Sequence, residues 1–194
     1  MCISAEAVVI PRRLPGDLAM WLFMLAELSV FALLIAAFAV TQTLTPQLFA
    51  DSRQLLDTST GLAMTLSLLS AGLLAALAQQ RVRQAQAGQA LGLLLLALLA
   101  ACGYLGLKLA EYQHLLSLGL GLEYNTFFTL YWILTGFHFL HVLLGMVILA
   151  WLAAGCRRRR YGPGNCSGFE SGVLYWHMVD LIWVVLFPLV YVLA

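Results

Sequence analysis

Five long apolar runs, separated by short polar clusters, constrain what this chain of 194 residues can fold into. They cover residues 17–40, 58–78, 89–110, 126–154 and 172–193. An α-helix rises about 1.5 Å per residue, so about 20 apolar residues are enough to cross the hydrocarbon core of a bilayer. We therefore predict an all-α integral membrane bundle of five transmembrane helices.

The composition agrees with this prediction and excludes several other classes. Hydrophobic residues make up 62% of the chain and charged residues 10%, and the mean hydropathy is +0.92. A soluble domain is roughly half apolar and a quarter charged. A soluble enzyme, a disordered chain, a disulfide scaffold and a nucleic-acid-binding domain are thereby excluded. The connecting segments are short, so residues 1–194 are expected to form a single membrane domain with residues 1–14 as a tail.

The lysines and arginines between the spans predict the orientation, because cytoplasmic loops carry the excess of these residues. One side has Arg12, Arg13, Arg81, Arg83 and the run Arg157–Arg160, eight residues in all. The other side has two, namely Arg53 and Lys108, the latter at a predicted helix end. We expect the N-terminus and the tail to be cytoplasmic and the C-terminus to be periplasmic.

Ionisable residues in or beside the predicted spans are the candidates for function, since each is costly in a membrane unless it is paired or faces water. Glu27 falls near the midplane, and Asp180 shares a helix face with His177 and Glu170 because their offsets are close to whole turns. One possibility is that these groups hydrogen-bond to one another across helices. The other is that they form a site open to the cytoplasm, which is either a proton antenna or a binding site for lipid headgroups. The candidate buried or proton-collecting carboxylates are Glu27 and Asp180; the candidate cleft or interhelical polar residues are His138, His141, Glu170, His177, Lys108 and Glu111.

Spacing and residue type add three further expectations. Lys108 and Glu111 are three residues apart on one helix and can pair with each other. Pro188 is expected to kink the last helix, and Tyr191, near its end, fits an interfacial anchor. Small residues let helices approach closely in lipid, so packing faces are expected at Gly61, Ser67, Ser70, Gly72, Gly136 and Gly145.

Two other functions remain open from the residues alone. A haem b carrier would need facing histidines, such as His138 or His141 with His177, and would show a Soret band. A transporter would move a solute without a partner protein. No inverted repeat is apparent in the sequence, which argues against this function. The chain has no nucleophile with its base, no phosphate loop and no HExxH motif, so we expect neither a catalytic centre nor a metal site.

Four motifs together resemble subunit III of the haem–copper oxidase superfamily, in a short five-helix form. They are PGDLAMWLFMLAEL (residues 15–28), KLAEY (108–112), TGFHFLHVLLG (135–145) and ESGVLYWHMVDLIWVVLFPLVY (170–191). Within the family, PGDLAMW and WVVLFPL are most similar to the NorE-like branch, which is associated with nitric oxide reductase.

The resemblance implies a non-catalytic accessory subunit in a bacterial inner membrane. Such a subunit binds no haem or metal, flanks the catalytic subunit of a respiratory complex, and supports its proton uptake and stability. The expected partner is a nitric oxide reductase; the alternative is an oxygen-reducing cytochrome c or quinol oxidase. Glu27 matches the family's buried carboxylate. The polar positions that line the family's phospholipid-holding cleft are matched by His138, His141, Glu170, His177 and Asp180.

Overall fold

Helices account for nearly all of residues 18–193, the part of the chain that the computed structural model describes. In chain order they are α1 (Leu18–Leu44), α2 (Pro46–Arg53), α3 (Thr58–Arg83), α4 (Ala87–Ser117), α5 (Thr126–Arg157), α6 (Ser167–Phe187) and the π-helix η1 (Pro188–Val192). Five spans are long and apolar enough to cross a membrane, the last formed by α6 and η1 together. The five-helix all-α prediction is confirmed. The predicted tail, with Arg12 and Arg13, lies outside the described residues.

The helices differ from the predicted spans mainly at their ends. The helix α4 continues to Ser117, because the polar segment around Glu111 stays helical although its hydropathy is low. Lys108 is therefore well inside a helix and not at its end, so it does not belong in the loop charge count. The helix α6 changes to a π-helix at Pro188, the residue expected to kink it.

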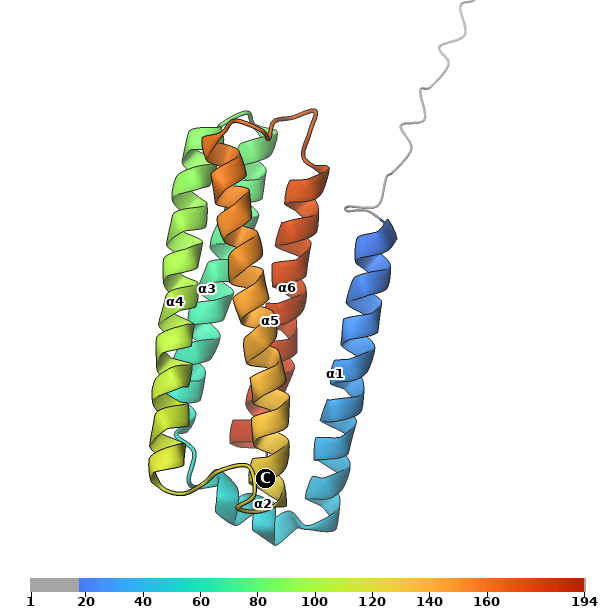
Figure 1. Cartoon of the computed structure of the whole chain (residues 1–194), viewed down its shortest axis with the longest axis vertical. Helices are drawn as coiled ribbons and strands as arrows, with labels where there is room; N and C mark the ends of the chain where they lie inside the picture. Colours follow the sequence, from blue (N-terminus) through green and yellow to red (C-terminus); the bar gives the residue numbers. More distant parts are fainter. Residues whose placement is uncertain (1–17, 194) are drawn as a thin grey trace, which may run out of the picture.

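Four helices, α3, α4, α5 and α6, form a bundle, and α1 lies alongside it next to α5 and α6 (Figure 1). The short connections 84–86 and 158–166 lie at one end, whereas α2 and the connection 118–125 lie at the other. We call the first the arginine-rich end, because its described arginines are Arg81, Arg83 and Arg157–Arg160. The cytoplasmic placement of this end remains a prediction.

Glycines allow close contacts in the bundle. A Cβ atom on Gly145 of α5 would lie 2.9 Å from the ring of Trp176 on α6, and one on Gly61 of α3 would lie 2.9 Å from the ring of Phe187. These two residues are packing positions, as predicted. At Gly136 a Cβ would meet nothing within 4 Å, so the packing role expected there is wrong.

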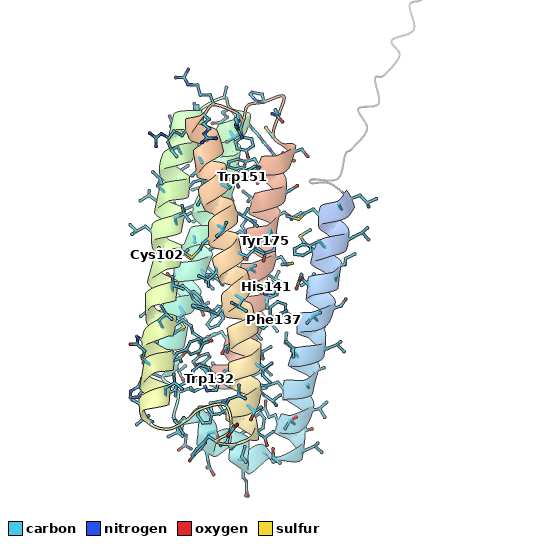
Figure 2. The ribbon with its side chains drawn as sticks, in the orientation of Figure 1. Cys102, Trp132, Phe137, His141, Trp151 and Tyr175 are labelled. Atoms are coloured by element: carbon cyan, nitrogen blue, oxygen red, sulfur yellow. The ribbon has the colours of Figure 1, made fainter. Side chains whose placement is uncertain are left out.

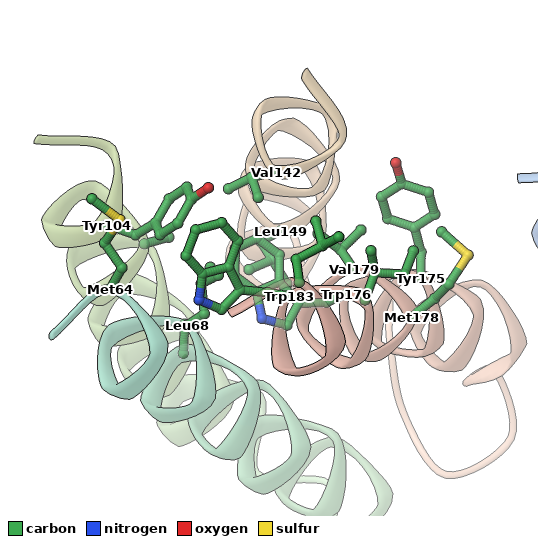
Figure 3. Packing of buried hydrophobic residues seen from close by; sticks show 14 of the residues in the cluster. Met64, Leu68, Tyr104, Val142, Leu149, Tyr175, Trp176, Met178, Val179 and Trp183 are labelled. Carbon is green, nitrogen blue, oxygen red and sulfur yellow. The ribbon is translucent and has the colours of Figure 1, made fainter. Parts of the chain in front are cut away.

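Two tryptophans of α6 fill the centre of the bundle. Figure 3 shows Trp176 and Trp183 pointing from α6 towards α3, α4 and α5, whereas Tyr175 and Met178 lie on the opposite side. The indole nitrogen of Trp183 donates to the hydroxyl of Thr65 on α3, with a separation of 2.9 Å. This bond satisfies a polar atom that would otherwise be costly to bury.

The helix α1 is attached along a narrow seam. Its buried residues are Met24, Phe31 and Phe38, seven residues apart, so they lie on one line of the helix. Only 17% of the apolar stretch of α1 is buried in the structure, against 56% for that of the α6–η1 span. The rest of α1 is left for lipid or for another protein chain.

Candidate functional site

A buried cluster links α4, α5 and η1 in the half of the bundle away from the arginine-rich end. The Nζ atom of Lys108 lies 2.6 Å from a carboxylate oxygen of Glu111 and 3.0 Å from the hydroxyls of both Tyr131 and Tyr191. Both hydroxyls also lie 2.9 Å from a Glu111 oxygen. We call these four residues the lysine cluster. The Lys108–Glu111 pairing expected from the spacing is present.

The lysine cluster is buried and surrounded by aromatic rings. The side chain of Lys108 is fully buried and that of Glu111 is 7% exposed. The rings of Tyr112, Tyr131, Trp183 and Tyr191 have their centres 4.9–5.6 Å from Nζ. A charge taken out of water needs such an opposite charge, hydrogen bonds and ring faces. Tyr191 is therefore a buried cluster member, and the interfacial anchoring expected of it is wrong.

A second polar pair joins α1 to α5. The Nε2 atom of His141 lies 2.9 Å from a carboxylate oxygen of Glu27, and its Nδ1 atom lies 2.8 Å from the backbone oxygen of Phe137. A carbonyl oxygen only accepts, so Nδ1 must carry a hydrogen. One more proton must lie between Nε2 and the carboxylate, on either the histidine or the glutamate. The Glu27–His141 contact thus contains one shared proton.

The surroundings of this pair leave it accessible. The Glu27 side chain is 22% exposed and that of His141 is 10% exposed. The rings of Phe31 and Phe137 flank the imidazole, and the Tyr175 hydroxyl donates to the His141 backbone oxygen. Figure 2 shows His141 about half-way along the bundle, near Tyr175. Glu27 therefore has its partner on another helix, and the sequence of its own helix could not identify that partner.

His177 and Asp180 form a separate contact on α6. The Nδ1 atom of His177 lies 3.3 Å from Oδ2 of Asp180, and a Cβ added to Gly72 of α3 would collide with the same oxygen. Asp180 therefore needs a glycine opposite it. Glu27 pairs with His141 and not with these two residues, so a single network of Glu27, His177 and Asp180 is wrong.

His177 also borders an apolar groove between α1 and α6. The groove measures about 260 Å³ and is lined by Trp21, Met24, Leu25, Leu28, Leu174, His177, Met178 and Leu181. It exists because α1 contacts the bundle only along its narrow seam. Its walls suit an acyl chain, and the His177 side chain, 41% exposed, adds one polar group.

The other two predicted cleft residues lie elsewhere. His138 is fully buried, stacks on Trp183 with ring centres 5.1 Å apart and lies edge-on to Tyr104. Neither of its ring nitrogens has a hydrogen-bond partner among the described residues, so it is an interior residue and not part of a lipid-facing cleft. Glu170 does not join His177 or Asp180; it forms an ion pair of 2.9 Å with Arg83 at the arginine-rich end.

A hollow reaches the lysine cluster from the other end of the bundle. It measures about 370 Å³, and its polar lining residues are Asp57, Thr60, Glu111 and His114. Asp57 caps α3 by accepting hydrogen bonds from Thr60 and Ser59, and these bonds lower the pKa of its carboxyl group to about 2. Glu111 is thus the one member of the lysine cluster that faces this hollow.

Sequence reasoning missed several partners because they are on other helices. Tyr131 lies four residues before Thr135 and seven before His138, on the inward face of α5, and this spacing was a usable signal. Arg53 was considered only as a loop charge, whereas its guanidinium donates to the backbone oxygens of Val190 and Leu189 in η1. Among residues 18–193, no group of three or more histidines, cysteines or carboxylates is placed to hold a metal ion.

Comparison with known proteins gives a match over almost the whole chain. The family model described as "Cytochrome c oxidase subunit III" matches residues 15–194. The quinol oxidase subunit 3 of Bacillus subtilis is 26% identical over 177 residues, 91% of this chain and 86% of its own. The cytochrome c oxidase subunit 3 of Thermostichus vulcanus is 40% identical over 94 residues, which cover 47% of this chain and less than half, 44%, of that protein.

Proposed function

Because the chain belongs to the cytochrome c oxidase subunit III family, we propose that it is a non-catalytic accessory subunit of an oxygen-reducing terminal oxidase. The observation that carries this proposal is the match from residue 15 to residue 194, which leaves no span outside the family. The near full-length similarity to a quinol oxidase subunit 3 supports it. On this proposal the protein is located in a bacterial plasma membrane.

A nitric oxide reductase is the second candidate for the catalytic partner. The motif PGDLAMW, which resembles the NorE-like branch, favours it. The names of the relatives favour an oxidase instead, since both cytochrome c and quinol oxidase subunits are among them. We therefore place the oxidase first.

The Glu27–His141 pair is the proposed contribution of this subunit to proton uptake. It holds one transferable proton, lies half-way along the bundle and is partly exposed. The lysine cluster is less suited to this task, because its carboxylate already interacts with three donors. We also propose that a phospholipid acyl chain occupies the groove between α1 and α6, and that the chain itself binds no redox cofactor.

Purification of the tagged chain from its native membranes, in a mild detergent, tests the partner. We expect mass spectrometry to identify an oxidase catalytic subunit, with haem bands and oxygen consumption in the same eluate. Recovery of a nitric oxide reductase core would keep the accessory role and change the substrate. An eluate that contains this chain alone and shows no haem bands, even after crosslinking, would overturn the proposal.

The proton-uptake role is tested with Glu27→Gln in the assembled complex. The glutamine can still donate to Nε2 of a neutral His141, so the complex should assemble with the same subunits, whereas turnover should slow or the active lifetime should shorten. Glu170→Gln, which alters a carboxylate at the arginine-rich end, is the matched control and should turn over normally. Failure of Glu27→Gln to assemble would instead make the pair a structural contact.

A further inference from the structure

Four consecutive arginines are held on a fixed turn where α5 ends. The backbone N–H of Arg160 donates to the oxygen of Gly155 and that of Arg159 donates to the oxygen of Cys156, each at 3.0 Å. Arg159 has φ of 52°, the left-handed conformation that ends helices in this motif. The ring of Tyr161 folds back over Gly155, where a Cβ would collide with it. The arginine side chains are thus carried by an ordered backbone.

The charges of these arginines are unmatched within residues 18–193. None of the side chains of Arg157–Arg160 forms an ion pair or a side-chain hydrogen bond with a described residue. The described carboxylate at this end is Glu170, and Arg83 already binds it. An excess of positive charge at a membrane surface attracts anionic lipid headgroups.

Two of the arginines share a hollow of about 270 Å³ beside the end of α5. Arg158 and Arg160 line it together with Trp151, Tyr161 and Asn165, and no carboxylate is among its lining residues. Phosphate oxygens accept charge-assisted hydrogen bonds from guanidinium groups, often two at once. Tyr161 adds a hydroxyl to the same hollow, and the Asn165 amide, which donates one N–H to the backbone oxygen of Arg160, has a second N–H to donate.

An apolar stripe on α5 leads directly to this hollow. Its five members are separated by four, three, four and three residues, so they lie on one outward face of the helix. All of them are exposed in the bundle, Trp151 by 61% and Val147 by 65%. The stripe consists of Leu140, Leu144, Val147, Trp151 and Ala154, and the next position is Arg158.

We propose that this face of α5 binds an anionic phospholipid, with its phosphate between Arg158 and Arg160 and an acyl chain along the stripe. The unmatched positive charge favours a lipid with net negative charge over a zwitterionic one, whose ammonium group would be repelled. The site is on α5 and its following turn, away from the groove between α1 and α6. It does not depend on the proposed partner.

Tryptophan fluorescence of the purified full-length chain tests the proposal. The chain is reconstituted in phosphatidylcholine nanodiscs that contain increasing amounts of phosphatidylglycerol with brominated acyl chains. Trp151→Phe supplies the signal to subtract, so that the quenching of Trp151 alone is measured. We expect brominated phosphatidylglycerol to quench Trp151 at much lower mole fractions than brominated phosphatidylcholine does.

A charge-matched pair of double variants makes the test specific. Arg158→Gln with Arg160→Gln removes two surface charges, each of which contributes about 1 kcal/mol to anionic lipid binding, and also the guanidinium donors to the phosphate, so it should weaken binding by at least about 30-fold. Arg81→Gln with Arg157→Gln removes the same charge but no donor of the hollow, so it should weaken binding by about 10-fold or less. Equal losses in both double variants would overturn the site, as would equal quenching by the two lipids. Displacement by inorganic phosphate at constant ionic strength would also overturn it, because the ligand would then be a soluble anion.

Discussion

The lysine cluster and the Glu27–His141 pair both place charges inside one bundle, but in opposite settings. The lysine cluster joins three elements that pack closely, and its carboxylate is bound by an ammonium group and two hydroxyls. The Glu27–His141 pair joins α5 to the loosely attached α1, and its carboxylate is 22% exposed. The cluster is thus fully partnered and enclosed, whereas the pair shares one proton and is partly exposed.

The enclosure of the lysine cluster leads to the largest expected effect. Glu111→Leu would leave the ammonium group of Lys108 buried without its counter-charge, which should lower the free energy of unfolding by about 3–5 kcal/mol. Equilibrium unfolding in mixed micelles measures this change. The double variant Lys108→Met with Glu111→Leu should recover most of the loss, because apolar residues then replace both charges. A single variant as stable as the parent would show that the cluster does not hold the bundle together.

Gly72→Ala tests how tightly the polar contact beside the groove is packed. The added methyl group would collide with Oδ2 of Asp180, so either the Asp180 side chain must leave its contact with His177 or α3 and α6 must separate, at a cost of about 1–3 kcal/mol. Gly136→Ala is the control: a Cβ there meets nothing within 4 Å, and alanine favours a helix over glycine by about 1 kcal/mol. Unfolding midpoints of the two variants should therefore move in opposite directions. Equal midpoints would mean that α3 and α6 adjust freely around Asp180.

Glu27→Gln should change stability much less than Glu111→Leu does. The glutamine amide keeps a hydrogen bond to His141, and the side chain is partly exposed, so a loss of about 1 kcal/mol or less is expected. The same micelle titration provides the comparison. A loss as large as that of Glu111→Leu would contradict the distinction between the two sites.

The smallest expected effect concerns Asp57, on the hollow beside the lysine cluster. Hydrogen bonds from Thr60 and Ser59 lower the pKa of its carboxyl group from 3.8 to about 2 in the folded chain. A lowered pKa means that the carboxylate stabilises the fold above about pH 4, and that this contribution is lost as the pH falls through about 2. Unfolding midpoints measured between pH 5 and pH 2 should show this decline. The asparagine in Asp57→Asn can still cap the helix but does not titrate, so the unfolding midpoint of this variant should fall less between pH 5 and pH 2. Parallel pH curves for the variant and the parent would contradict the assignment to Asp57.

Hydropathy alone was enough to predict the five spans, because a membrane requires long apolar helices whatever their packing. It failed where polar residues continue a helix, as around Glu111, and where a short helix such as α2 lies outside the spans. The Lys108–Glu111 pair was predictable because both residues are on one helix. The spacing of Tyr131 could place it on the inward face of α5, but its contact with Lys108, like that of Tyr191, depends on how α5 and η1 are rotated towards α4.

The same reason explains the errors among the candidate site residues. Glu27 and His141 are 114 positions apart, and no local pattern indicates that α1 turns its carboxylate towards α5. His138 and His141 are three residues apart and were assigned to one cleft, yet one is enclosed by Trp183 and Tyr104 whereas the other faces α1. A helix face is wide enough for two adjacent residues to have different neighbours.

The seam of Met24, Phe31 and Phe38 has a consequence for the biogenesis of the protein. Of the five described spans, α1 is synthesised before the other four and gains least from contact with the rest of the chain. It therefore remains an independent helix in the bilayer until α5 and α6 have been inserted and can offer it a surface. The order of synthesis and the order of assembly are thus reversed for α1, which joins a nearly finished bundle as its last helix.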